Sequence, residues 1–163
     1  MAIKVFITGG TIDNLDYDTE GEAPKDQKTI IPNLLKRSKI SFGYDIEMVC
    51  FKDSRFLDDH DRELLLKKCK GCPEEKIIVT HGTMTMPTTA QFLGRNKLPK
   101  TIVLAGSAIP GNKPNSDALF NLGFAFGAVQ VLPPGVYVAM NGKIFLWNNV
   151  KKNLDTGFFE AEE

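Results

Sequence analysis

Apolar and polar positions along the chain follow a pattern that predicts strands and helices in turn. Short apolar runs bounded by turn residues predict buried strands, and apolar residues recurring every three or four positions predict helices. The strands are expected at 3–7, 44–51, 76–80 and 101–105. The helices are expected at 29–39, 58–71 and 87–95, and a fourth follows a cap at 115–117 and runs to residue 130. This alternation predicts an α/β fold, with a mostly parallel sheet and helices on both faces in a three-layer, Rossmann-like or flavodoxin-like arrangement.

A β-hairpin is predicted toward the C-terminus. The dipeptide Asn141-Gly142 lies between the apolar stretches 135–140 and 143–146, and Asn-Gly in such a setting is the strongest short hairpin signal. A chain of 163 residues suits one hydrophobic core. We therefore expect a single domain over residues 1–163.

Two segments lack apolar periodicity. Residues 13–28 are rich in Asp, Glu, Gly and Pro and are expected to form a mobile surface loop, since long loops in compact domains are often lids or binding loops. Residues 153–163 end in an acidic run and are expected to form a solvated tail.

Charge and hydropathy exclude several classes of partner. The chain has 20 Lys and Arg against 20 Asp and Glu, and its formal net charge is +0. A chain with this balance lacks the excess of basic residues that is typical of nucleic-acid binders. No apolar run approaches the roughly 18 residues of a membrane span, and the first residues do not resemble a leader peptide. We expect a cytoplasmic protein without nucleic-acid or membrane partners.

The three cysteines allow a further chemistry to be considered. Cys69 and Cys72 form a single CxxC pair, and a structural zinc site would need two more ligands from Cys50, His60 and His81. Metal or redox function is therefore one hypothesis, but the simpler interpretation is a pair of reduced thiols at the end of a helix.

Four successive predicted strands end in small turns rich in glycine and hydroxyl groups: Thr8-Gly9-Gly10-Thr11, Asp53-Ser54, Thr80-His81-Gly82-Thr83 and Ala105-Gly106-Ser107. In parallel sheets, ligands bind outside the carboxyl ends of the strands. The hydroxyls could supply a nucleophile, with a lysine or His81 as its base, although His81 could equally fix its own turn. Neither GxGxxG nor GxxxxGK[ST] occurs, which disfavours a nucleotide.

The segments Ile7–Ile12 and Thr80–Met86 resemble the two signature segments of the bacterial-type L-asparaginase family. The resemblance covers about residues 3–152, which correspond to that family's N-terminal domain. It implies hydrolysis of the side-chain amide of asparagine, and often of glutamine, without a metal or cofactor. It also implies a small amide substrate and a homodimer.

The resemblance assigns roles to individual residues. Thr11 matches the threonine nucleophile, Thr83 matches a second catalytic threonine, and Lys152 matches the lysine that works with it. Tyr17 stands where a lid tyrosine activates the nucleophile. The substrate-binding positions that follow are Gly10, Ser54, Gly82, Met84 and Ser107, with Ser54 matching the serine that holds the substrate's α-carboxylate.

Two departures from the family pattern bear on activity. Met84 occupies the position of an aspartate that binds the substrate's α-ammonium and partners the lysine, and a thioether does neither. The sequence also stops where the family's smaller C-terminal domain would begin, so we expect that domain's contribution to be missing or replaced. We predict an amide hydrolase that is weak or altered in substrate unless another acid, such as Asp53 or Asp117, takes the place. The alternative is a non-catalytic protein that binds a small amide or carboxylate.

Overall fold

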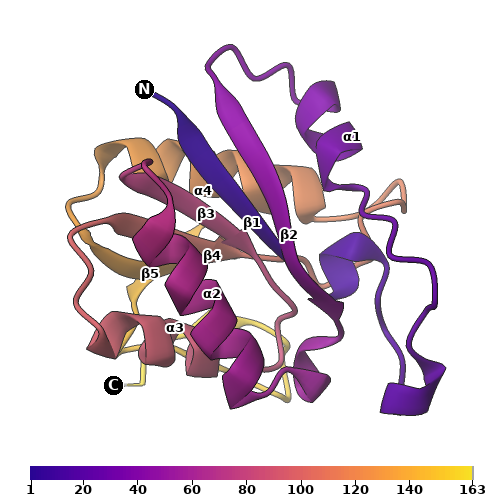
Figure 1. Cartoon of the computed structure of the whole chain (residues 1–163). Helices are drawn as coiled ribbons and strands as arrows, with labels where there is room; N and C mark the ends of the chain where they lie inside the picture. Colours follow the sequence, from indigo (N-terminus) through magenta and orange to yellow (C-terminus); the bar gives the residue numbers. More distant parts are fainter. Residues whose placement is uncertain (163) are drawn as a thin grey trace.

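A six-stranded sheet, five strands of it parallel, forms the centre of the computed structural model, which describes residues 1–162 (Figure 1). The strand order is β2-β1-β3-β4-β5-β6, and only β6 runs antiparallel to its neighbour. The strands are β1 (Ile3–Gly9), β2 (Tyr44–Lys52), β3 (Lys76–Thr80), β4 (Thr101–Ala105), β5 (Gly135–Met140) and β6 (Lys143–Leu146). The predicted parallel sheet and its terminal hairpin are confirmed.

Helices cover both faces of this sheet, as predicted. They are α1 (Ile31–Arg37), α2 (Asp59–Gly71), α3 (Met86–Arg95) and α4 (Ala118–Val131). Successive side chains of a strand point to opposite faces, so Val5 joins the core with α1 and α4, while Phe6 joins the core with α2 and α3. Figure 1 shows α2 and α3 in front of the sheet and α4 behind it. Within residues 1–162, no helix has the length and hydropathy needed to cross a bilayer.

Helix ends follow local side-chain chemistry. Asp58 caps α2, because its carboxylate accepts a hydrogen bond from the Asp61 N–H at 2.9 Å while the Asp61 carboxylate accepts one from the Asp58 N–H at 3.1 Å. Helix α4 begins at Ala118, directly after the predicted cap segment 115–117. The Asp117 carboxylate does not cap it, since it accepts hydrogen bonds from the Ala108 and Ile109 N–H groups.

The segment 13–28 is not wholly a surface loop. Two short 3₁₀ helices, η1 (Thr11–Asp13) and η2 (Glu20–Glu22), lie in or beside it, and Leu15 and Tyr17 are buried. Their apolar side chains join the core on the α1 and α4 face, which periodicity could not reveal in so irregular a stretch. Its mobility stays a prediction.

The C-terminal segment is also more ordered than a solvated tail. Strands β7 (Lys151–Lys152) and β8 (Phe159–Glu160) pair antiparallel in a second, two-stranded sheet. The Phe159 side chain is only 2% exposed, and it packs into the core on the α2 and α3 face. A single buried aromatic therefore anchors this segment. The last residue of the predicted tail, Glu163, lies outside the described residues.

Candidate active site

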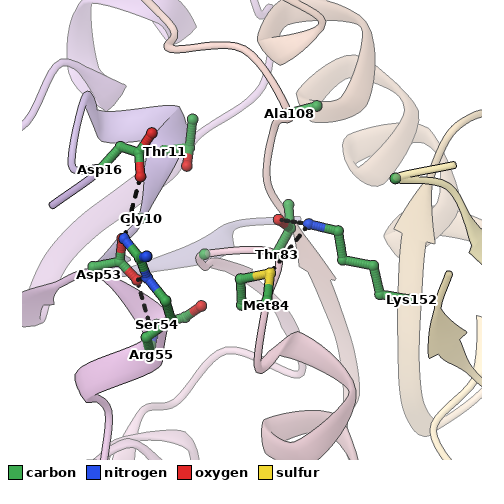
Figure 2. Close-up of a pocket in the computed structure, with 12 residues that line it drawn as sticks. Gly10, Thr11, Asp16, Asp53, Ser54, Arg55, Thr83, Met84, Ala108 and Lys152 are labelled. Carbon is green, nitrogen blue, oxygen red and sulfur yellow. Dashed lines mark hydrogen bonds and ion pairs between the residues drawn. The ribbon is translucent and has the colours of Figure 1, made fainter. Parts of the chain in front are cut away.

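A cavity of about 270 Å³ opens at the carboxyl ends of β1, β2 and β3 (Figure 2). The parallel strands bring turns that are distant in sequence to this one edge. The residues that line the cavity are Gly10, Thr11, Asp16, Asp53, Ser54, Arg55, Gly82, Thr83, Met84, Ala108, Lys152 and Gly157. Seven of the nine predicted site residues are in this set: Gly10, Thr11, Ser54, Gly82, Thr83, Met84 and Lys152.

Two glycines hold the turns after β1 and β3 in contact. Gly10 has a φ of +89°, a backbone conformation that side chains rarely adopt. A Cβ atom at Gly10 would lie 2.3 Å from the Gly82 nitrogen and 2.4 Å from the Gly82 Cα. Each glycine immediately precedes a threonine, so this contact brings Thr11 and Thr83 to the same cavity.

Thr83 and Lys152 form a hydrogen-bonded pair in the cavity. The Lys152 Nζ atom donates a hydrogen bond to the Thr83 Oγ1 atom at 2.9 Å. Burial lowers the pKa of the Lys152 amine below its ordinary value, because an apolar environment disfavours the charged form. A lysine with a lowered pKa beside a hydroxyl can serve as a base for nucleophilic catalysis.

Met84 lies beside this pair. Its Sδ atom is 3.5 Å from the Lys152 Nζ atom, and its side chain is 45% exposed. Figure 2 shows the sulfur next to the amine and to Thr83. A thioether offers the amine only a weak acceptor and no negative charge, so Lys152 has no carboxylate at this position.

The two acids that could have replaced the missing carboxylate are engaged elsewhere. The Asp53 carboxylate accepts hydrogen bonds from the Arg55 Nε atom at 3.0 Å and the Arg55 Nη2 atom at 2.8 Å. Asp117 does not line the cavity, because backbone N–H groups and the Asn121 amide hold its carboxylate. The structure thus places neither acid beside Lys152.

Arg55 is a cavity residue that the sequence patterns did not reveal. Its Nη2 atom also donates to the Asp16 carboxylate at 3.2 Å and to the Tyr17 carbonyl. Burial would raise the pKa of Asp53, but its hydrogen bonds with Arg55 hold that pKa below its ordinary value. The only indication in the sequence that Arg55 and Asp16 line the cavity is that each is adjacent to a predicted site residue, Arg55 to Ser54 and Asp16 to Tyr17.

Two predicted site residues lie outside the cavity lining. The Tyr17 hydroxyl accepts a hydrogen bond from the Asp53 N–H at 3.0 Å, and its ring stacks on Phe56 with centroids 5.2 Å apart. The Ser107 hydroxyl donates to the Ile109 carbonyl at 2.6 Å. In this structure Tyr17 ties the loop to the end of β2, and Ser107 shapes its own turn.

Ser54 presents its hydroxyl to the cavity from the short helix η3 (Ser54–Phe56). Its Oγ atom accepts a hydrogen bond from the Thr85 N–H at 3.2 Å, and its carbonyl accepts one from the Thr85 hydroxyl at 2.7 Å. These contacts hold Ser54 close to Gly82, where a Cβ would lie 2.7 Å from the Ser54 Oγ atom. The serine O–H can therefore donate to a ligand.

His81 fixes the turn that carries Gly82 and Thr83. Its Nδ1 atom lies 2.7 Å from the Gly82 carbonyl oxygen and its Nε2 atom 2.7 Å from the Thr89 hydroxyl. Burial lowers the pKa of His81 to about 4, so the ring is neutral at pH 7. It donates from Nδ1 and accepts at Nε2, while Thr89 accepts from the Arg62 Nε atom at 3.1 Å.

The CxxC pair lies at the end of α2, and neither of its cysteines lines the cavity. Burial raises the pKa of the Cys69 thiol to about 12, and a protonated thiol is a poor nucleophile. The Cys72 thiol contacts the carbonyls of Cys69 and Glu74. Within residues 1–162, no group of three His, Cys, Asp or Glu side chains could hold a metal ion.

Comparisons with known proteins identify relatives of this chain. Residues 2–160 match the family model described as "Asparaginase, N-terminal". The chain is 43% identical over 79 residues to the L-asparaginase of Thermococcus kodakarensis, a match covering 47% of this chain and 24% of that protein. It is 40% identical over 160 residues to one component of the glutamyl-tRNA(Gln) amidotransferase of Methanococcus vannielii, covering 87% of this chain and 34% of that protein.

Solved structures show the same fold. The thermostable L-asparaginase from Thermococcus kodakarensis superposes with a TM-score of 0.79 at 29% identity, over 99% of this chain and 51% of that one. A probable cytoplasmic L-asparaginase from Campylobacter jejuni superposes with a TM-score of 0.82 at 29% identity, over 98% and 52%. The chain thus spans about half of the length of these proteins.

Proposed function

Because the chain belongs to the asparaginase family, whose N-terminal domain it matches over residues 2–160, we propose that it is an asparaginase-like amide hydrolase with a threonine nucleophile. Its substrate would be L-asparagine or a related small amide, and its products an acid and ammonia. The observation that carries this proposal is the 2.9 Å hydrogen bond from Lys152, whose pKa is lowered, to Thr83 inside the cavity.

The proposed reaction has two steps. The Thr11 Oγ1 atom attacks the amide carbonyl carbon, the C–N bond breaks, and ammonia leaves an ester on Thr11. Water then attacks the ester, which releases the acid and regenerates the hydroxyl. Lys152, acting through Thr83, accepts the proton of the attacking hydroxyl and passes it to the leaving nitrogen. Backbone N–H groups beside Thr83 would stabilise the oxyanion.

Ammonia release from L-asparagine and from other small amides tests this proposal. Thr11→Val and Lys152→Met should each lower kcat/KM by at least about 10²-fold, the usual size of a lost nucleophile or acid–base contribution. The matched controls are Thr19→Val, at an exposed threonine outside the cavity, and Lys151→Met, at the exposed neighbour of Lys152. Hydrolysis that survives in Thr11→Val would exclude Thr11 as nucleophile.

A second candidate function is non-catalytic binding of a small amide or carboxylate. It is favoured by Met84, which leaves Lys152 without a carboxylate partner. This function predicts saturable thermal stabilisation by the ligand without ammonia release. Ammonia release that depends on Thr11 would exclude it.

We also propose a homodimer that assembles through the outer face of α4. No residue of α4 is charged, yet Phe120 is 62% and Val131 80% exposed. A Cβ at Gly123 or Gly127 would meet open space, so a second copy could approach this face closely. Sedimentation should give a dimer, and Gly127→Glu should convert it to a monomer.

The cellular location is a further part of the proposal. The cysteines are free, and one structural relative is named as a probable cytoplasmic enzyme. We propose a cytoplasmic protein on these grounds. Fractionation of the source cells, with the protein detected by antibody, would place it in the soluble intracellular fraction if this is correct.

A further inference from the structure

We propose that the cavity selects a small amide that carries a carboxylate group and no amino group, such as the monoamide of a short dicarboxylic acid. This inference rests on the proposed amide hydrolase and defines its substrate class. It depends on the charges around the cavity, on the position of Met84 and on the donors available at Ser54 and Arg55.

Both acids that line the cavity already contact a cation of the protein. Arg55 and Lys152 are the cations, and Asp16 and Asp53 are the acids. Both oxygens of Asp53 accept hydrogen bonds from the Arg55 guanidinium, at 3.0 and 2.8 Å, and Asp16 contacts the same group at 3.2 Å. A substrate ammonium would have to share these carboxylates with the guanidinium, whose positive charge already compensates them.

On the Lys152 side of the cavity, Met84 offers no carboxylate to a substrate ammonium. Its sulfur contacts the Lys152 amine at 3.5 Å, and a thioether cannot compensate a positive charge. An ammonium placed there would lose hydration beside a lysine without gaining a carboxylate, and an unpaired charge is costly to bury. The cavity therefore disfavours an α-amino acid.

A carboxylate, in contrast, finds donors at the Ser54 end. The Ser54 Oγ atom accepts from the Thr85 N–H, so its own hydrogen is available to a ligand oxygen. Within the described residues, the Arg55 Nη1 atom contacts only Asp18, at 3.5 Å, and it can donate to a second oxygen. Guanidinium groups suit the planar geometry of carboxylates.

The groups at the two ends of the cavity together indicate the class of ligand. A carboxylate at Ser54 and Arg55 would place the other end of a short molecule at Thr83 and Lys152, where the amide reacts. The volume of about 270 Å³ is below the roughly 300–1,000 Å³ of sites for drug-sized ligands. It suits a chain of a few carbons. Succinamate, which is L-asparagine without its amino group, is the matching probe.

The test compares succinamate with L-asparagine in ammonia release by the full chain. We expect kcat/KM for succinamate to exceed that for asparagine by at least about tenfold, which corresponds to about 1.4 kcal/mol. Met84→Asp, which restores a carboxylate beside Lys152, should shift the ratio toward asparagine by at least tenfold. Asn112→Asp adds the same charge at an exposed residue outside the cavity and should leave the ratio unchanged.

Binding of the two product acids separates the selectivity from the hydrolysis. Calorimetry with succinate and L-aspartate should give at least tenfold tighter binding of succinate. If asparagine is hydrolysed faster than succinamate, the substrate class is wrong while the hydrolase stands. If neither amide is hydrolysed but succinate binds preferentially, the selectivity holds and the hydrolase fails. If aspartate binds as tightly as succinate, or neither acid binds, the inference is overturned.

Discussion

Lys152 donates a hydrogen bond to Thr83 from a position 69 residues further along the chain. The two side chains come from different sheets, since Thr83 follows β3 and Lys152 belongs to β7. This hydrogen-bonded pair therefore exists only when the short C-terminal sheet is docked against the main one. Its chemistry and its stability can be tested separately.

The lowered pKa of Lys152 predicts a pH dependence of the rate. A base must be neutral to accept a proton, so kcat/KM for ammonia release should fall as the pH drops through the Lys152 pKa, which lies below 10.5. Lys152→Arg, whose side chain stays charged, should show a low rate without this limb, whereas Lys151→Met should keep it. The same limb in Lys152→Arg would assign it to another group.

The contact between Gly10 and Gly82 predicts that one methyl group added at residue 10 lowers the free energy of unfolding. In Gly10→Ala, the new Cβ would collide with the Gly82 backbone at a φ of +89°. Backbone strain alone costs about 1–3 kcal/mol, so urea denaturation should show a loss of at least about 2 kcal/mol. Gly21→Ala, where a Cβ meets nothing within 4 Å, is the matched control. Equal stability of the two variants would contradict the contact.

Tyr17→Phe distinguishes a structural role from a chemical one. The Tyr17 hydroxyl accepts the Asp53 N–H, and loss of a partner for a buried donor costs about 1–3 kcal/mol. We expect that loss in urea denaturation, with a fall in kcat much smaller than in Thr11→Val. A large fall in kcat at unchanged stability would instead give the hydroxyl the catalytic role implied by the family resemblance.

His81 predicts acid sensitivity of the fold. Its pKa is lowered from 6.5 to about 4 in the folded chain, so the unfolded chain binds more protons between these values. Stability should therefore fall as the pH drops through this window, by up to about 3 kcal/mol. Urea midpoints at pH 7 and pH 4.5 measure the change. The exposed His60 provides the control, since His60→Gln should keep this pH dependence and His81→Gln should reduce it.

Phe159→Ala should disturb activity as well as stability. The side chain is 2% exposed, and truncation of a buried Phe to Ala typically costs about 3–5 kcal/mol. Because β8 pairs with the strand that carries Lys152, ammonia release should fall with stability. Phe158, the adjacent residue, is 61% exposed, so Phe158→Ala should change both quantities little. Equal effects of the two variants would contradict the anchoring role.

Most of the fold could be predicted because it depends on local patterns. Short apolar runs and helical spacing are properties of neighbouring residues, and they located the six strands and four helices of the main domain. The turns after β1, β2 and β3 were then assigned to one edge by the geometry of parallel sheets. Their glycines and hydroxyls supplied five of the twelve residues that line the cavity.

The remaining features depend on contacts that have no local signal. Arg55 acts through acids at positions 16 and 53, and nothing in its own neighbourhood distinguishes it from a surface arginine. Tyr17 is in a segment without periodicity, yet its hydroxyl reaches Asp53. Phe158 and Phe159 are adjacent aromatic residues that both suit a packing role, and only the structure shows that Phe159 is the buried one.

The small size of the β7–β8 sheet should limit the temperature up to which Lys152 stays in contact with Thr83. Each strand has two residues, and Phe159 is the only one of the four that is buried. Regions with so few buried contacts open at lower free energy than the core. Lys152 belongs to this sheet, so a local opening that leaves the main sheet intact would move the proposed base away from Thr83. On heating, ammonia release should therefore stop several degrees below the temperature at which circular dichroism records unfolding. On cooling, ammonia release should return, because the main sheet has not unfolded.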